Sequence, residues 1–329
     1  MGEVMRGCKF HVWTAMLAIV FTVAAVAGCQ EPPLPHEVTA NDILTRSLTE
    51  PLRTNVEQAI NNRDYKTAEK LLVHEINNRP RSHDLLIVLG GIFFLDGKYL
   101  NSAVAYKKAE RIAPLDPRSR FTLAMSYIVL GRRDWARPEL EKLERADPQN
   151  FLYPYWLSRL DYDEMHYAKA IDEVHKAIEL NPRSVNAYED LGLCLEALGK
   201  YDEAVRVFRQ GLQLNQQEIC SPWPGLNLGA LLIKMNQFAE AAAALENSLH
   251  CDSHFPDAYY QLGLMLEKQG KDKEAMLQLE HAVSLKPSFA APYYALGRIY
   301  HRQGRDDKAQ QAFHMFQKLS QGGVLSSRN

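Results

Sequence analysis

"AYEDLGLCLEALGKYDEAVRVFRQGLQLN" (residues 187–215) recurs with changes as "AYYQLGLMLEKQGKDKEAMLQLEHAVSLKP" (258–287) and "PYYALGRIYHRQGRDDKAQQAFHMFQ" (292–317). When the shared Leu-Gly pair is taken as positions 7 and 8, units begin at residues 49, 83, 117, 151, 185, 222, 256 and 290. Successive starts are equally spaced except between 185 and 222, where a short insertion lies near "QQEICSP". A fixed period of this kind predicts stacked copies of one structural unit.

Small residues recur at two positions of the unit. Position 20 reads Ala68, Ser102, Ala136, Ala170, Ala204, Ala241, Ala275 and Ala309, and position 8 is Gly, Ala or Ser in every unit except the first, which has Val56. Small residues let two helices approach closely, while large residues at positions 7 and 24 fill the space around the contact. Glycines break the chain between the helices, and proline at position 32 ends the second helix; these residues are Gly97, Gly131, Gly199, Gly270, Gly304, Pro80, Pro114, Pro148, Pro182 and Pro287.

This pattern resembles the tetratricopeptide repeat, a helix–turn–helix unit of about 34 residues. The resemblance covers residues 49–323 and implies an all-α, right-handed superhelical solenoid of about eight repeats. Residues 324–329 are expected to form a C-terminal tail. A chain of 329 residues would ordinarily suggest two domains, but the repeat period predicts one elongated body instead.

Residues 1–28 have the features of an exported protein's signal peptide. Arg6 and Lys9 form a basic head, and an apolar core of about 15 residues follows, which is short for a bilayer-spanning helix. The core ends in Val26-Ala27-Gly28-Cys29, which resembles the lipobox of bacterial lipoproteins, so residues 1–28 are expected to be removed and Cys29 to carry a lipid. An ordinary secretory signal and an uncleaved anchor helix are the alternatives.

The residues after Cys29 indicate a spacer and a destination. Residues 29–48 contain Pro32, Pro33 and Pro35, which is typical of an extended linker that lifts a folded body off a membrane. The expected location is the bacterial cell envelope, and Gln30, which is not Asp, favours the periplasmic face of the outer membrane over the inner membrane.

Several classes of function receive no support from the sequence. The net charge is −2 and no Lys/Arg cluster stands out, so nucleic acid is not an expected partner. No phosphate-binding loop, dinucleotide fingerprint, nucleophile elbow or zinc-protease helix appears. The sequence therefore predicts no enzyme activity, no cofactor and no metal, and the polar run 250–254 ("HCDSH") reads as an inter-helix turn.

A helical wheel of each first helix places positions 2, 5, 9, 12 and 13 on one side. In tetratricopeptide proteins this side lines the concave groove, and the resemblance implies the same role here. The lining is apolar and aromatic over three adjacent units, and the predicted peptide-binding residues are Ile87, Phe94, Phe121, Met125, Tyr155, Arg159 and Tyr162. Later units are mixed, and their lining residues are Glu189, Glu196, Trp223, Lys234, Tyr260, Glu267, Lys268, Tyr294, Arg298 and His301. The alternative is that the rings pack against neighbouring first helices.

The leading functional hypothesis is a non-enzymatic, membrane-anchored scaffold that binds a protein segment in this groove. Lipoproteins of similar architecture serve in secretion or pilus assembly or as envelope adaptors. A module for glycan or peptidoglycan fragments and an accessory subunit that recruits a separate enzyme are the alternatives. Paired carboxylates in the groove would favour sugar, and a dry apolar groove would favour peptide.

Two cysteines are candidates for a disulfide. Cys220 lies in the insertion before a first helix, and Cys251 lies where the following second helix ends. Antiparallel helices bring these points to the same end of the unit, and an oxidising compartment would allow them to join. Two free thiols near a loop are the alternative. Cys194, at an inward position, reads as a small buried residue.

Overall fold

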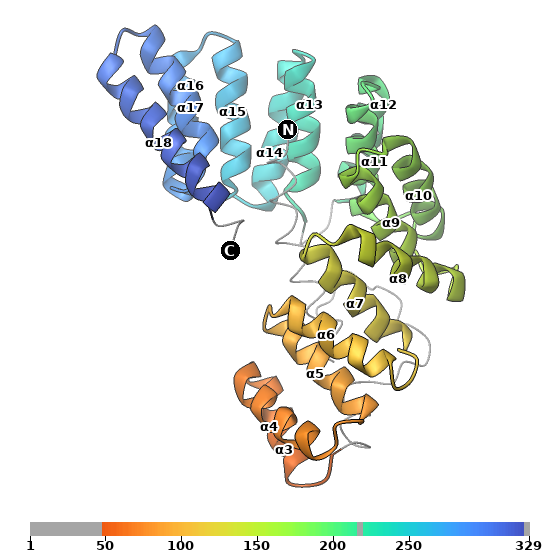
Figure 1. Cartoon of the computed structure of the whole chain (residues 1–329). Helices are drawn as coiled ribbons and strands as arrows, with labels where there is room; N and C mark the ends of the chain where they lie inside the picture. The colour runs from red at the N-terminus through yellow and green to blue at the C-terminus, as the bar shows by residue number, and fades with distance from the viewer. Residues whose placement is uncertain (1–47, 216–219, 326–329) are drawn as a thin grey trace. The chain divides into compact units, whose positions relative to one another are not determined.

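The computed structural model describes residues 48–215 and 220–325. Their helices carry the labels of Figure 1. The predicted signal peptide, Cys29 and most of the predicted linker lie outside the described residues. The helices are α3 (Leu52–Asn61), α4 (Tyr65–Asn78), α5 (His83–Leu95), α6 (Tyr99–Glu110), α7 (Pro117–Val129), α8 (Arg133–Ala146), α9 (Leu152–Asp163), α10 (Tyr167–Leu180), α11 (Val185–Ala197), α12 (Tyr201–Leu214), α13 (Trp223–Lys234), α14 (Phe238–Cys251), α15 (Pro256–Lys268), α16 (Asp272–Leu285), α17 (Ala290–Arg302) and α18 (Asp306–Leu325).

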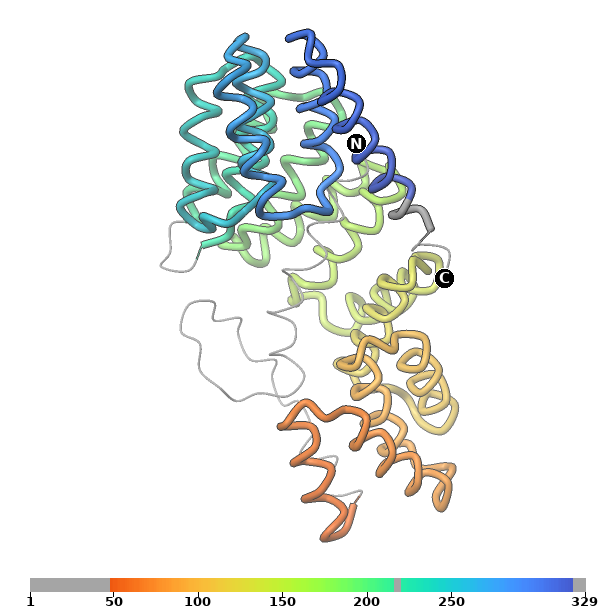
Figure 2. The backbone as a smooth tube through the Cα atoms, turned by 90° about the vertical axis from the view of Figure 1, so that its left-hand side faces the viewer, coloured from red at the N-terminus to blue at the C-terminus, as the bar shows by residue number. Residues whose placement is uncertain are grey.

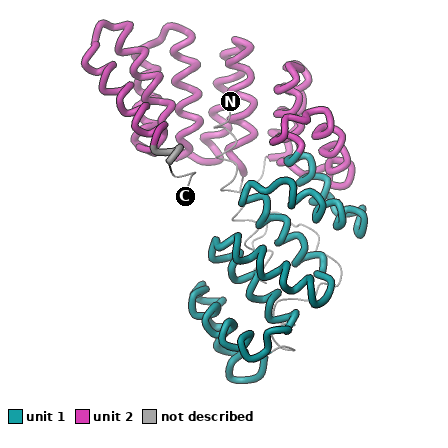
Figure 3. The backbone as a smooth tube through the Cα atoms, in the orientation of Figure 1, with its two compact units in different colours: residues 1–160 teal, residues 161–329 magenta. Residues whose placement is uncertain are grey.

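These helices confirm the all-α class and the helix–turn–helix repeat. Odd-numbered helices are the first helices of the repeats, even-numbered ones are the second helices, and the described chain contains no strand. The helices divide into two compact units, 1–160 (unit 1) and 161–329 (unit 2), with the division inside α9 (Figure 3). Helix α18 runs to Leu325, so it continues into the segment 324–329 that the sequence assigns to a tail.

The turn between the two helices of a repeat needs a left-handed backbone at position 15. Glycine supplies it at five turns, with φ of +69° to +76° between Gly97 and Gly304. Arg63, Met165 and Asn236 adopt the same conformation at the other three turns, with φ of 56°, 60° and 61°. Non-glycine residues occupy this region at a cost. The turn geometry is therefore imposed by helix packing and does not depend on glycine alone.

The core is built from the small positions that the period predicts. All eight residues at position 20 are 0–2% exposed. In unit 2, a Cβ added at position 8, at Gly192, Gly229, Gly263 or Gly297, would lie under 3.0 Å from the side chain at position 24. Glycine at position 8 thus makes room for the large residue of the facing helix, such as Phe208 against Gly192.

Within unit 2, first helices form one layer and second helices the other. Helices α11, α13, α15 and α17 contact one another in sequence order, and each packs antiparallel against its own second helix (Figures 1 and 2). We call the outer surface of α11, α13, α15 and α17 the first-helix face. Within the described ranges, no helix combines the length and the apolar character that a bilayer crossing requires.

Candidate functional site

Three of the seven predicted peptide-binding residues are part of the core. Ile87, Met125 and Tyr155 are only 7%, 4% and 4% exposed. The prediction that they line an open groove is therefore wrong. First helices of neighbouring repeats lie in contact, as α5 and α7 do, so apolar residues at positions 5 and 9 gain more from packing against the next helix than from facing solvent.

The other four predicted residues are half-buried. Phe94 and Phe121 pack against the core of unit 1, and Phe121 contacts the Tyr153 ring at 6.1 Å between centroids. Arg159 donates a 3.3 Å hydrogen bond from Nη1 to the Tyr155 hydroxyl. Tyr162 belongs to unit 2, where its ring contacts Tyr167 and burial raises the pKa of its hydroxyl. Neither compact unit therefore contains all seven residues, and those of unit 1 are mainly structural.

The two candidate cysteines are joined. A disulfide links Cys220 and Cys251, whose Cα atoms lie 5.3 Å apart, which is an ordinary separation for such a bond. The Asn215 side chain donates from Nδ2 to the Ser221 carbonyl at 2.6 Å and accepts from the Ser221 amide at 3.0 Å, which fixes the chain beside the bond. Cys194 is buried and free, as its inward position predicts.

Among the residues that the structure describes, one group of potential metal ligands occurs that the sequence pattern does not indicate. The ligand atoms of Asp161, Glu164 and His166 all lie within 4.8 Å of one another at the turn after α9. The His166 Nδ1 is 3.7 Å from an Asp161 carboxylate oxygen and 3.5 Å from one of Glu164. Both carboxylates also interact with other groups. We therefore assign these residues to polar contacts around the turn and derive no metal site from them.

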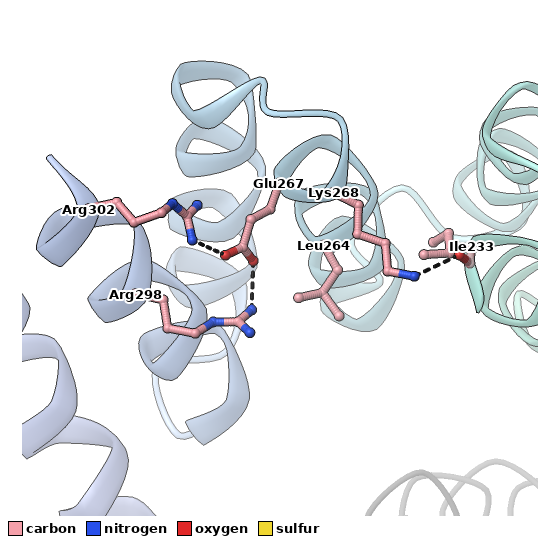
Figure 4. A pocket seen from close by; sticks show the side chains of 6 residues that line it. All are labelled: Ile233, Leu264, Glu267, Lys268, Arg298 and Arg302. Atoms are coloured by element: carbon pink, nitrogen blue, oxygen red, sulfur yellow. Dashed lines mark hydrogen bonds and ion pairs between the residues drawn. The ribbon is translucent and has the colours of Figure 1, made fainter. Parts of the chain in front are cut away.

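A pocket of about 410 Å³ opens on the first-helix face of unit 2. Its volume lies within the usual range of ligand sites. The lining side chains come from three successive first helices, α13, α15 and α17, and are Ile233, Leu264, Glu267, Lys268, Arg298 and Arg302 (Figure 4). They occupy positions 9, 12 and 13 of their repeats, which are positions that the helical wheel assigns to the groove.

Ion pairs hold one side of this pocket in place. Glu267 is the centre: one carboxylate oxygen accepts from Arg298 at 2.6 Å and the other from Arg302 at 2.8 Å (Figure 4). Arg302 also donates to Asp272 at 2.8 Å, and hydrogen bonds to Asp272 and Glu267 raise the pKa of its guanidinium. The Arg298 Nε atom is buried and has no hydrogen-bond partner among the described residues. The pocket therefore combines an apolar floor with ordered cations.

The helical wheel placed Glu267, Lys268 and Arg298 in the groove lining, but the prediction ranked the apolar run of the earlier repeats above them. The predicted lining does not name Ile233, Leu264 and Arg302, although they occupy positions on the same side of the wheel. A signal for the charged residues is present in the sequence: acids at position 12 precede basic residues at position 13 of the next repeat, as in Glu196 and Lys234 or Glu267 and Arg302. Pairing of these charges across neighbouring helices keeps the layer polar and leaves it exposed.

Three family models match this chain. Residues 157–219 and 293–320 match models described as tetratricopeptide repeat, and residues 265–304 match one described as TPR repeat. Among solved structures, a tetratricopeptide repeat protein from Parabacteroides merdae is 21% identical, covers 76% of this chain and 98% of its own, and superposes with a TM-score of 0.63. The pilus biogenesis factor PilW is 22% identical, covers 61% and 92%, and has a TM-score of 0.56. At these identities the likeness shows the fold alone.

Two curated proteins are also similar. The human protein O-mannosyl-transferase TMTC1 is 25% identical over 174 residues, which are 50% of this chain and 19% of that protein. A BBSome complex member BBS4 homologue from Drosophila melanogaster is 27% identical over 112 residues, 33% of this chain and 23% of that protein. The chain spans about a fifth of the length of these relatives. Repeat period, buried small positions and matching family models together identify tetratricopeptide repeats within this chain.

Proposed function

We propose that this chain is a non-enzymatic scaffold that binds a segment of another protein on the first-helix face of unit 2. The observation that carries the proposal is the pocket between α13, α15 and α17. Its floor is apolar at Ile233 and Leu264, and cationic side chains surround it. Apolar burial together with Arg is the combination that contributes most to protein–protein binding.

The glycan alternative has less support at this pocket. Sugar sites need carboxylate and amide groups that are free to accept and donate hydrogen bonds. Both oxygens of Glu267 already accept from arginines, and this side chain is only 10% exposed. A protein segment with an apolar side chain suits the site better.

We also propose that the scaffold works at a bacterial envelope, anchored through a lipid on Cys29, as an adaptor of the kind that serves secretion or pilus assembly. The periplasmic face of the outer membrane is the proposed location. The Cys220–Cys251 disulfide supports export, because disulfides persist in oxidising compartments such as the bacterial periplasm. Palmitate-analogue labelling tests the anchor: Cys29→Ser should abolish both the label and the processing, whereas an unlabelled mature wild-type protein would contradict it.

A photo-crosslinker tests where the partner binds. Tyr294 on α17 is 46% exposed and its ring lies 5.3 Å from the Arg298 guanidinium, so p-azidophenylalanine at this position reports on the first-helix face. Leu277 on α16, 64% exposed in the second-helix layer, is the matched control. In envelope extract, a partner segment identified by mass spectrometry should crosslink from Tyr294 and not from Leu277. Equal yields from both positions would overturn the proposal.

A further inference from the structure

Charge pairs connect neighbouring first helices of unit 2 in a regular order. An acid at position 12 of one repeat pairs with a cation at position 13 of the next. Glu196 on α11 accepts from Lys234 on α13 at 3.3 Å, and Glu267 on α15 accepts from Arg302 on α17 at 2.8 Å. Burial lowers the pKa of Lys234, but its hydrogen bond to Tyr201 and the charge of Glu196 outweigh that effect and raise it. The pairing therefore stabilises the charged lysine.

Between α13 and α15, the middle step of this series, the charge pair is absent. Position 12 of α13 is Ile233, which has no carboxylate to offer to Lys268 at position 13 of α15. The Lys268 ammonium instead donates to the Ile233 backbone carbonyl at 3.0 Å (Figure 4). In the part of the chain that the structure describes, no acidic side chain forms an ion pair with Lys268.

The residues of this missing charge pair lie in the pocket. Ile233, Leu264 and Lys268 all line it, and the buried Arg298 Nε is a second donor without a described partner. An ammonium has three donors, and the carbonyl of Ile233 accepts from one. An anion that enters the pocket therefore meets the remaining donors of the Lys268 ammonium beside an apolar surface, where a charge-assisted hydrogen bond is stronger than in open water.

We propose that Lys268 binds an internal Asp or Glu side chain of the partner segment, which supplies the carboxylate that Ile233 lacks. This inference rests on the proposed function. A single negative charge fits better than a phosphate, because the carboxylate of Glu267 lines the same pocket and repels a dianion more strongly. The apolar floor fits an aliphatic side chain next to the acid.

Two defined peptides test the inference with the full-length chain. The probe is a fluorescent peptide of alternating Leu and Glu, acetylated at its N-terminus and amidated at its C-terminus, so that only side chains carry charge. The same peptide with Gln in place of Glu is the uncharged comparison. We expect the wild type to prefer the Glu peptide by about tenfold in Kd, since a hydrogen bond to a charged group contributes roughly that factor. Equal affinities, or no binding of either peptide, would overturn the inference.

Matched lysine variants locate the effect. Lys268→Met should remove the preference for Glu, whereas Lys234→Met, which removes another exposed lysine whose partner is Glu196, should keep it. Ile233→Glu should give Lys268 a carboxylate partner within the chain and so also remove the preference for the Glu peptide, provided that circular dichroism shows a folded chain. A preference that survives Lys268→Met overturns the inference whatever Ile233→Glu does. If the partner crosslinks from Tyr294 but the preference for the Glu peptide survives Lys268→Met, only the inference fails. If no partner crosslinks from Tyr294, the proposed function fails.

Discussion

The layer of first helices has different roles in unit 1 and in unit 2. In unit 1, positions 5 and 9 carry Ile87, Met125 and Tyr155, which are buried between neighbouring helices. In unit 2, positions 9, 12 and 13 carry Arg298, Glu267 and other charged residues, which pair with one another around a pocket. The comparison teaches that the repeat period determines where the helices lie, whereas the residues of the first-helix layer decide whether that layer is core or binding surface.

The largest expected effect comes from a contact that occurs in both units, at position 8. Gly192→Leu should destabilise the chain by about 5 kcal/mol, because even a Cβ there would overlap the Phe208 ring. Gly91→Ala in unit 1 is the control: the nearest atom would lie 3.5 Å away, so this variant should change stability by less than about 1 kcal/mol. Urea denaturation measures both, and similar losses would show that position 8 does not control the approach of the helices.

Position 5 allows a matched comparison of one residue from each unit, because Tyr155 and Tyr294 are the same residue at the same position. Tyr155 is 4% exposed and Tyr294 is 46% exposed. Tyr155→Ala should lower the free energy of unfolding by about 4 kcal/mol, as loss of a buried ring does, and Tyr294→Ala by less than about 1 kcal/mol. Tyr294→Ala should still weaken partner binding. If Tyr155→Ala leaves the free energy of unfolding unchanged, the result would support the open groove predicted for unit 1.

A covalent bond is a further difference, since the described disulfide lies in unit 2. Removing it by Cys220→Ser with Cys251→Ser should cost about 3 kcal/mol, because the bond joins residues separated by 31 positions. Cys194→Ser, at a buried free cysteine, serves as the control for loss of a thiol. Reductant should lower the urea midpoint of the wild type but leave the double variant unchanged. Insensitivity of the wild type to reductant would contradict a stabilising bond.

The smallest effect concerns the turns. Met165 has φ of 60° and is 72% exposed, so Met165→Gly should stabilise the chain by about 1 kcal/mol by relieving a conformation that side chains disfavour. Gly199→Ala, at φ of +76°, should destabilise it by a similar amount. Thermal denaturation by circular dichroism gives both signs. If both variants lose stability, the turn at Met165 depends on its side chain.

Much of the fold could be predicted from the sequence because its determinants are local and repeat. Ala204 at position 20 and Gly192 at position 8 specify close packing wherever they recur, and five of the left-handed turns carry glycine. The repeat period places a turn at Met165, but its left-handed backbone could not be predicted, because nothing in a methionine indicates a positive φ. The helices supply that constraint through packing.

The site was less predictable because burial depends on the neighbouring helix. Phe121 and Tyr155 have the composition of a binding groove, and only the packed layer shows that Tyr155 is core. Lys234 and Lys268 look alike in the sequence. They differ in the residue that faces them from the preceding repeat, Glu196 for one and Ile233 for the other. Comparing each cation at position 13 with the residue at position 12 of the preceding repeat would have shown that Lys268 lacks an acidic partner there.

The Cys220–Cys251 bond also determines how the chain responds to force. Its two ends enclose all of α13 and α14, which carry Ile233 at the edge of the pocket. When the chain is pulled from its two termini, tension passes through the disulfide and bypasses these helices. The fully stretched chain is then about 100 Å shorter than the reduced one, at roughly 3.3–3.6 Å for each of the 31 enclosed steps. A scaffold under load would thus keep tension off one wall of its pocket while the helices beyond the bond are drawn out.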